Sequence, residues 1–307
     1  MKLAIPDLIS PSYFPALAAA ELGFFAREGL DVSAELIYPV DRAYEALRDG
    51  TVDFVGGAAH AVPSAFPEWR GAKLLAALAQ GMYWFLVMRA EFGIARGDLA
   101  ALKGRRIGAA PWVETGLRGL LLAAGIDPNR DDVRIGPVPR TGAAGTNFGL
   151  AAAEALERRE IDGFWANGMA AALAGAGGFG TVVLDVRRGD GPPGCFDYTF
   201  PALVTTDRLI ERSPETAAAA TRALVACHAA LKADVAMATT VGERRFPPRE
   251  TALIAELIHR DLPFYDAAIS ETSIAGVSAF CRRMGIIGRD IPYVDAVATQ
   301  ARELWPR

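Results

Sequence analysis

The chain alternates between strand-like and helix-like patterns of apolar residues almost from end to end. Residues 30–36 place an apolar side chain at every second position, as a half-buried strand does. Residues 41–49 follow a helical pattern that Gly50 ends, and Pro15 begins an earlier helix that Gly23 ends. Strand and helix patterns in this order predict an α/β fold with mostly parallel sheets and flanking helices.

The same alternation continues into the second half of the chain. Strands are expected near residues 3–5, 30–36, 52–55, 106–109, 133–135, 161–164, 181–184 and 199–205. Further helices are expected at residues 114–124, 146–159 and 167–173, and one begins at Ser213 as N-cap with Pro214 in the first turn. The sharpest break is the Gly-Asp-Gly-Pro-Pro-Gly segment at 189–194. A chain of 307 residues has room for two domains of about 100 to 200 residues each.

Composition excludes several classes of partner. Apolar residues make up 51% and charged residues 22%, as in ordinary globular proteins. The net charge is −4 and no basic cluster stands out, so we do not expect nucleic acid to bind. Cys195, Cys227 and Cys281 are too few and too scattered for a disulfide framework or a zinc site. No apolar run reaches the roughly 18 residues of a membrane-spanning helix, so we expect a protein that is not membrane-embedded.

Four segments carry a resemblance to a known family. The most specific is Ala-Ala-Glu-Leu-Gly-Phe-Phe-Ala-Arg-Glu-Gly-Leu-Asp-Val at residues 19–32, which follows the first expected strand. Residues 46–54, 99–108 and 155–164 support it in the same order. With these segments the chain resembles the alkanesulfonate-, nitrate- and thiamine-pyrimidine-type substrate-binding proteins of ABC importers.

The resemblance implies a two-lobed, type II periplasmic-binding-protein-like fold. Lobe one would comprise residues 1–88 and 199–307, including the helical C-terminal part, and lobe two residues 89–198. The chain would cross between the lobes near Arg89 and Tyr198, and a ligand would bind in the cleft between them. The Gly/Pro break at 189–194 supports the second crossing, whereas the residues alone say nothing about the first.

Ligands of open α/β sheets bind beyond the carboxyl ends of the strands, on the loops that lead into helices. In this sequence those loops contain several aromatic residues, which would form a stacking pocket. We expect Phe14 and Phe148 to pack into the lobe cores instead. The expected ligand-binding residues are Ser10, Tyr13, His60, Tyr83, Trp84, Trp112, Thr115, Asn147 and Trp165.

Two helix starts are candidates for binding an anionic group of the ligand, as members of the resembled family do. Residues 142–146 and 112–116 would each present backbone N–H groups at the positive end of a helix. Arg118 and Arg140 are close enough in sequence to add positive charge. Glu114 leaves an alternative open, because its carboxylate could cap its own helix or meet a cationic ligand.

One motif has to be rejected. Residues 175–180 satisfy the pattern G-x-G-x-x-G. A dinucleotide site needs this pattern after a strand and before a helix, whereas here it follows a helix and precedes a strand. We therefore read it as a connecting turn and expect neither a cofactor nor a metal.

An enzyme on the same fold remains an alternative. Fungal pyrimidine synthases of this fold carry a Cys-rich iron motif, which this chain lacks. Aromatic sulfinate desulfinases use a cysteine after the first strand, where this chain has Ser10 and Ser12. His60, at the end of a strand, could serve as a base, so a decarboxylase or lyase stays open. A ligand sensor whose closure another protein detects is the third candidate.

The sequence thus predicts a binding protein that closes over a small, planar or aromatic metabolite for ABC-type import, with an anionic group left open. Its partners would be this ligand and, if the protein is exported, the membrane subunits of the importer. Met1 and Lys2 lead directly into the first expected strand, without the segments of a signal peptide. The expected location is therefore the periplasm if a signal was removed, or else the cytoplasm.

Overall fold

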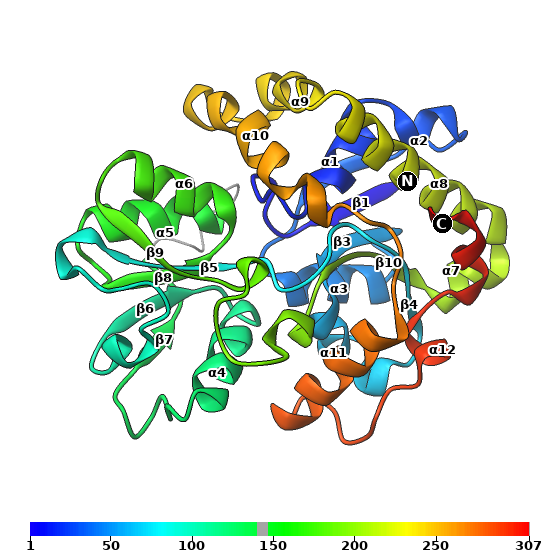
Figure 1. Cartoon of the computed structure of the whole chain (residues 1–307). Coiled ribbons are helices and arrows are strands. Elements are labelled where there is room, and N and C mark those ends of the chain that lie inside the picture. The colour runs from blue at the N-terminus through cyan, green and yellow to red at the C-terminus, as the bar shows by residue number, and fades with distance from the viewer. Residues whose placement is uncertain (140–146, 307) are drawn as a thin grey trace.

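A computed structural model describes residues 1–139 and 147–306. It contains two five-stranded sheets, each covered by helices on both faces (Figure 1). The second sheet, with α4, α5 and α6, forms lobe two on the left of Figure 1, and the remaining elements form lobe one on the right. Both termini lie in lobe one. The predicted α/β class is confirmed.

The sheet of lobe one has the order β2-β1-β3-β10-β4. β1 pairs in parallel with β2 and β3, whereas β10 pairs antiparallel with β3 and β4. β10 is therefore the one reversed strand, and the other four run in the same direction. The bounds are β1 Lys2–Ile5, β2 Ser33–Leu36, β3 Phe54–Ala58, β4 Ala72–Ala77 and β10 Pro201–Thr206.

The sheet of lobe two repeats this plan with the order β7-β6-β8-β5-β9. β6 pairs in parallel with β7 and β8, and β5 is the reversed strand between β8 and β9. The reversed strand in each sheet is the one by which the chain arrives from the other lobe. The bounds are β5 Phe85–Arg89, β6 Arg106–Ala109, β7 Arg134–Gly136, β8 Gly163–Ala166 and β9 Gly180–Asp185.

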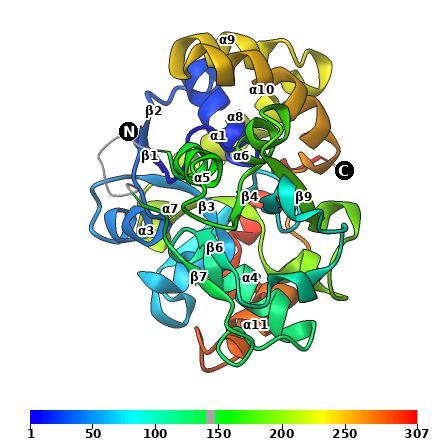
Figure 2. The same cartoon turned by 90° about the vertical axis from the view of Figure 1, so that its left-hand side faces the viewer.

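Helices cover both sheets, and in lobe two α5 and α6 lie on one face and α4 on the other (Figure 2). Their bounds are α4 Val113–Ala123, α5 Phe148–Glu157 and α6 Gly168–Ala176. Lobe one holds α1 Phe14–Glu21, α2 Phe24–Arg27, α3 Val40–Arg48, α7 Asp207–Arg212, α8 Pro214–Ala233, α9 Met237–Arg245, α10 Pro248–Asp261, α11 Glu271–Arg283 and α12 Tyr293–Ala296.

The chain crosses between the sheets twice, at residues 78–84 and 186–200. Because β5 pairs in the second sheet, the first crossing comes before Phe85, not near Arg89 as the domain boundaries assumed. The two crossings touch: the Met82 amide donates to the Phe196 carbonyl at 2.9 Å. Gly81 must be glycine, because its φ is +69° and a Cβ would lie 2.2 Å from the Phe196 ring.

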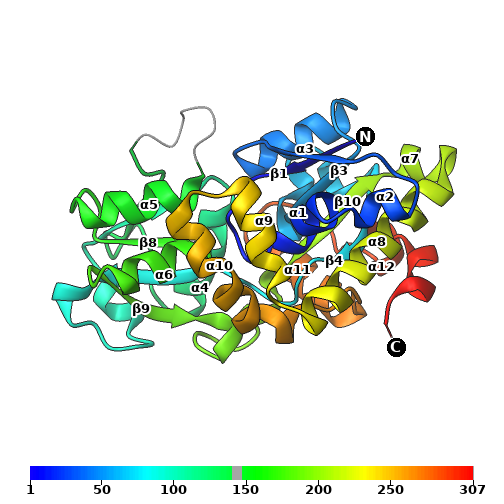
Figure 3. The ribbon, with the colours of Figure 1, turned by 90° about the horizontal axis from the view of Figure 1, so that it is seen from above.

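The C-terminal helices also reach across to lobe two. α10 packs against α6 (Figure 3), and the Arg249 side chain donates to the Leu173 carbonyl at 3.5 Å. On another side, Gly119 of α4 faces the Phe280 ring of α11, which a Cβ at that position would approach to 2.6 Å. Helices of lobe one therefore contact lobe two at places other than the two crossings.

Several local predictions differ from the structure. The alternating segment 30–36 forms a strand only at Ser33–Leu36, at the edge of its sheet. β4 and β5 were not predicted, because their apolar residues stand next to one another, at 74–77 and 85–88, and so carry no periodicity. Ser213 stands at the start of α8, but its side chain makes no capping hydrogen bond. The glycine-rich segment 175–180 joins α6 to β9, in the order expected of a connecting turn.

In the described chain, no helix on its own combines the length and hydropathy needed to cross a membrane. By length and composition alone, α8 and α9 pass that test as a pair, with a bend of 113° between them.

Candidate functional site

A small, partly open cavity lies where the two sheets face each other. Its volume is about 30 Å³, room for about two water molecules. Both lobes supply its walls, through loops at the carboxyl ends of β1, β2, β6 and β8, as expected for α/β sheets. The reversed strand β5 presents its amino end at this same edge. The lining residues are Pro6, Asp7, Ser10, Tyr13, Tyr38, Val40, Trp84, Ala110, Pro111, Val113, Phe148, Ala166 and Asn167.

Asp7 joins the two lobes across this cavity. Its Oδ2 accepts a hydrogen bond from the Asn167 side-chain amide at 2.6 Å and one from the Gly149 backbone amide at 3.3 Å. Its Oδ1 is buried and has no hydrogen-bond partner within the described residues. Burial raises the pKa of the Asp7 carboxyl to about 7, although the Asn167 side chain and the backbone amides of Gly149 and Ile9 act in the opposite direction.

Asn167 holds its position through its own helix. Its Oδ1 accepts from the backbone amides of Met169 and Ala170, at 2.9 and 3.1 Å, and so caps the start of α6. The side-chain amide is thereby directed at Asp7. A second bond joins the loop after β1 to the start of α5, because the Asn147 Oδ1 accepts from the Leu8 amide at 2.9 Å.

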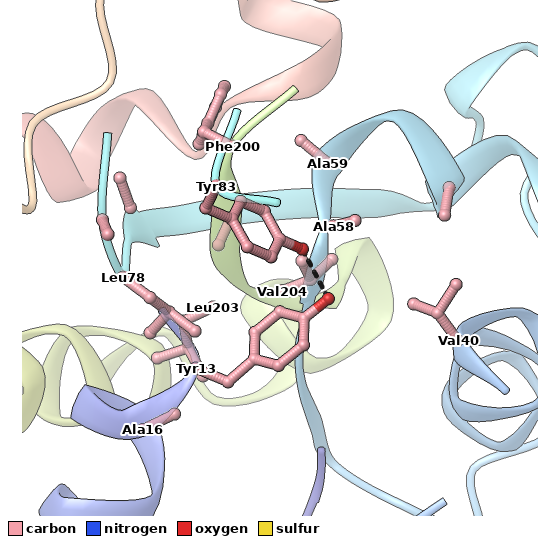
Figure 4. Close-up of a cluster of buried hydrophobic side chains, with 14 of the residues drawn as sticks. Tyr13, Ala16, Val40, Ala58, Ala59, Leu78, Tyr83, Phe200, Leu203 and Val204 are labelled. Atoms are coloured by element: carbon pink, nitrogen blue, oxygen red, sulfur yellow. Dashed lines mark hydrogen bonds between the residues drawn. The ribbon is translucent and has the colours of Figure 1, made fainter. Parts of the chain in front are cut away.

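Aromatic side chains form much of the cavity wall. Tyr38 of lobe one stacks on Phe148 of lobe two, with ring centroids 6.2 Å apart and 12° between the planes. Tyr13 and Trp84 face the same space. Behind them, the Tyr13 and Tyr83 hydroxyls are hydrogen-bonded at 2.5 Å within a buried apolar cluster (Figure 4). The site therefore offers flat apolar surfaces and few polar atoms.

His60 forms another contact between the lobes. Its Nε2 lies 3.0 Å from the Trp112 carbonyl, and its Nδ1 lies 2.9 Å from the Thr199 hydroxyl. Because a carbonyl only accepts, the proton is on Nε2, and Nδ1 accepts from Thr199. Burial lowers the pKa of His60 to about 4, so the ring is neutral at pH 7.

The backbone of Trp112 is unusual. Its φ is +67°, a conformation that costs a non-glycine residue roughly 1–3 kcal/mol. The Thr115 hydroxyl donates to the same Trp112 carbonyl that His60 contacts. The Thr115 backbone amide donates to it as well, so three donors hold the turn before α4 in place.

The structure places the nine predicted site residues in three groups. Ser10, Tyr13 and Trp84 line the cavity. Tyr83 and Trp165 are buried behind its wall, where the Trp165 ring contacts Trp84 at 6.1 Å between centroids. The third group, which makes hydrogen bonds between or near the lobes, is His60, Trp112, Thr115 and Asn147. Ligand contact by each of the nine stays a prediction.

Ten of the 13 described lining residues were not among the predicted site residues, and four of these have polar or aromatic side chains: Asp7, Tyr38, Phe148 and Asn167. Phe148 had been expected in the core, and it both packs there and lines the cavity. Asp7 could have been found, because it comes two residues after β1, where such sites form. By contrast, Phe14 is fully buried, as expected.

Of the two predicted anion sites, the structure describes only the one at the start of α4. Residues 142–146 and Arg140 lie outside the described residues. At the start of α4, the amides of Glu114 and Thr115 donate to the carbonyls of Ala110 and Trp112. The Arg118 side chain is directed away, donating to the Ile135 carbonyl at 3.0 Å. The described lining contains no lysine or arginine.

Two sheets of this topology, joined by two crossings around a shared cavity, define a type II periplasmic-binding-protein fold. Residues 10–234 match the family described as NMT1/THI5 like, and the chain therefore belongs to that family. A comparison with curated protein sequences gives no match.

Solved structures agree with this fold. The alkanesulfonate-binding protein SsuA from Xanthomonas axonopodis pv. citri is 12% identical, with a TM-score of 0.72 and 97% of each chain covered. The nitrate-binding protein NrtA from Synechocystis PCC 6803 is 14% identical, with a TM-score of 0.73 over 99% of this chain and 87% of that one. A ligand-binding component of an ABC-type import system from Staphylococcus aureus is 12% identical, with a TM-score of 0.70 over 99% and 97%.

Proposed function

We propose that this protein captures a small molecule in the cleft between its lobes and delivers it to an ABC-type importer. The observation that carries the proposal is the cavity itself, because both lobes supply its lining. The solved proteins with this fold include an alkanesulfonate-binding protein and a component of an ABC-type import system. The importer's membrane subunits and a periplasmic location belong to the same proposal, supported by the periplasmic nitrate-binding protein.

Lobe closure is the proposed mechanism. Asp7 and His60 of lobe one bond to Asn167 and to the Trp112 carbonyl of lobe two. These bonds need both lobes in contact, so parting the lobes would break them. A ligand that touches both walls stabilises the closed state and shifts the population toward it.

The ligand we propose is small and carries a planar or aromatic group. The stacked pair Tyr38 and Phe148, together with Trp84, supports this shape. The present volume of about 30 Å³ requires the lobes or the aromatic walls to move apart before such a ligand enters. The described lining gives no support to an anionic group on the ligand.

A thermal-shift screen tests the proposal. The library contains sulfonates, aromatic carboxylates, pyrimidines and other N-heterocycles, and a true ligand raises the melting temperature. A ligand at a hundredfold excess over its Kd stabilises the native state by about 2.7 kcal/mol. The hit is then incubated with the protein and analysed by mass spectrometry, and we expect it to be recovered unchanged. Conversion of the hit would contradict a transport role and favour the enzyme alternative.

A further inference from the structure

We propose that the ligand presents a cationic or N–H-donating nitrogen, of amidine or amine type, to the free Oδ1 of Asp7. This inference rests on the proposed function, because it takes the cavity as the ligand site. It adds the chemical class of the group that is recognised. The sequence had left open an anionic group on the ligand, whereas the group proposed here is a cation or a hydrogen-bond donor.

The carboxyl group is placed for this role. Asp7 is 8% exposed, and its Oδ2 is occupied by the two donors from lobe two, Asn167 and Gly149. Oδ1 is left as a buried acceptor in a wall of the cavity, without a partner among the described residues. A buried acceptor without a donor lowers the stability of the free protein. A ligand that supplies the donor removes this penalty and therefore binds more tightly.

The surroundings suit a cation as well as a donor. Asp7 is the only acidic or basic side chain in the described lining, so a cation meets no like charge there. Tyr13, Tyr38 and Trp84 line the same cavity, and aromatic faces attract cations. The Ser10 hydroxyl is 1% exposed and also lacks a described partner, so it offers a second acceptor near Asp7.

The test compares probes that share one skeleton and differ only in charge. The two series are benzamidine, benzamide and benzoate, and acetamidine, acetamide and acetate, with binding measured by calorimetry and thermal shift. We expect at least one amidine to bind wild type more tightly than its matched amide and acid. If neither amidine does so, the inference is overturned. The proposed function then still stands if the screen has found a ligand, and falls if no compound of any kind binds.

Asp7→Asn is the decisive variant, because its amide oxygen can still accept from Asn167 and Gly149 while an NH2 group replaces Oδ1. We expect amidine affinity to fall by about tenfold or more, as for loss of a charged hydrogen bond. Asp49→Asn, at an exposed carboxyl on the surface, is the control and should bind as wild type does. Unchanged amidine affinity in Asp7→Asn would overturn the inference.

A second readout does not depend on the variant folding. Because the pKa of Asp7 is about 7, the group is partly protonated in the free protein at pH 7 and must ionise to pair with an amidinium. Calorimetry of benzamidine or acetamidine in two buffers of different ionisation enthalpy should therefore show proton release on binding to wild type. Proton uptake on binding at pH 7 would contradict the proposal, because the carboxyl would then be neutral in the complex.

Discussion

The Asp7 Oδ2 lies 2.6 Å from the Asn167 Nδ2, and this hydrogen bond joins the loop after β1 in lobe one to the start of α6 in lobe two. The other oxygen of the same carboxyl is buried without a partner among the described residues. One side chain thus fastens the lobes together and keeps an acceptor at the cavity. The consequences can be measured without knowing the ligand.

The first prediction concerns pH. A carboxyl whose pKa is raised by folding, here to about 7, holds its proton in the native state at pH values where the unfolded chain has lost it. Its contribution to stability is complete below the unfolded pKa of about 4 and is lost as the pH rises to about 7. The largest slope for one such group is about 1.4 kcal/mol per pH unit.

We therefore expect Asp7→Asn to gain stability relative to wild type as the pH rises from about 4 to about 7. The comparison must be with wild type, because His60 and His228, with pKa values lowered to about 4 and about 3, act in the opposite direction. Tyr13, which lies near Asp7, has a raised pKa and stays neutral throughout. Urea unfolding at several pH values measures the difference, and a pH-independent difference would contradict the prediction.

The second prediction is that His60→Ala loses stability as well as affinity. The substitution removes the acceptor of the Thr199 hydroxyl and one of the donors to the Trp112 carbonyl, at a contact between the lobes. Each buried group left without its partner costs about 1–3 kcal/mol. Since the native pKa of His60 is about 4, its contribution in wild type declines as the pH falls from about 6.5 to about 4.

Thermal unfolding and ligand titration of His60→Ala test this, with the exposed His259→Ala as control. Loss of affinity with an unchanged melting temperature would instead favour His60 as a direct ligand contact. Loss of a chemical conversion would favour a catalytic base.

The third prediction separates two neighbouring tryptophans. Trp165 is fully buried behind the wall, whereas Trp84 lines the cavity. Trp165→Ala should lower the free energy of unfolding by about 3–5 kcal/mol, as for a large side chain removed from a core. Trp165→Phe should recover most of that loss. Trp84→Phe should lower ligand affinity and should lower stability less than Trp165→Phe does. Equal losses of stability in the two Phe variants would contradict this division.

The fourth prediction concerns a buried arginine at the second crossing. Arg187 donates to the Ser12 hydroxyl at 3.0 Å, to the Gln80 carbonyl at 2.9 Å and to Asp261 at 3.3 Å. The side chains of Arg187 and Asp261 are 3% and 4% exposed. Removing one partner of such a pair costs about 3–5 kcal/mol.

Arg187→Met should therefore lower stability by that amount, and it should weaken ligand binding because Arg187 connects the site loop, the crossing and α10. Arg188→Met is the control. Arg188 is its neighbour in sequence, but its side chain is 58% exposed, although its partner Asp185 is buried. Solvent screens the exposed arginine, so we expect a smaller loss than for Arg187. Similar losses in the two variants, measured by urea unfolding, would refute the structural role of Arg187.

The sequence by itself determined the fold class, most elements and the edge of the sheets at which the site lies. Periodicity and glycine stops are local properties, so the bounds of α3 and α4 could be predicted to within one residue. Strand ends followed by loops also pointed to Ser10, Tyr13 and Trp84, which line the cavity. The reversal of β5 and β10 could not be read, because strand direction depends on pairing between distant segments.

Only the tertiary structure decided which loop residues meet. Asp7 and Asn167 are separated by 160 positions, and nothing in the sequence predicts that they form a hydrogen bond. Trp165 and Trp84 look alike in sequence, yet one packs behind the wall and the other faces the cavity. The physical reason is that burial and charge compensation are collective: the pKa of Asp7 and the free Oδ1 arise only when the walls of both lobes exclude water from that carboxyl.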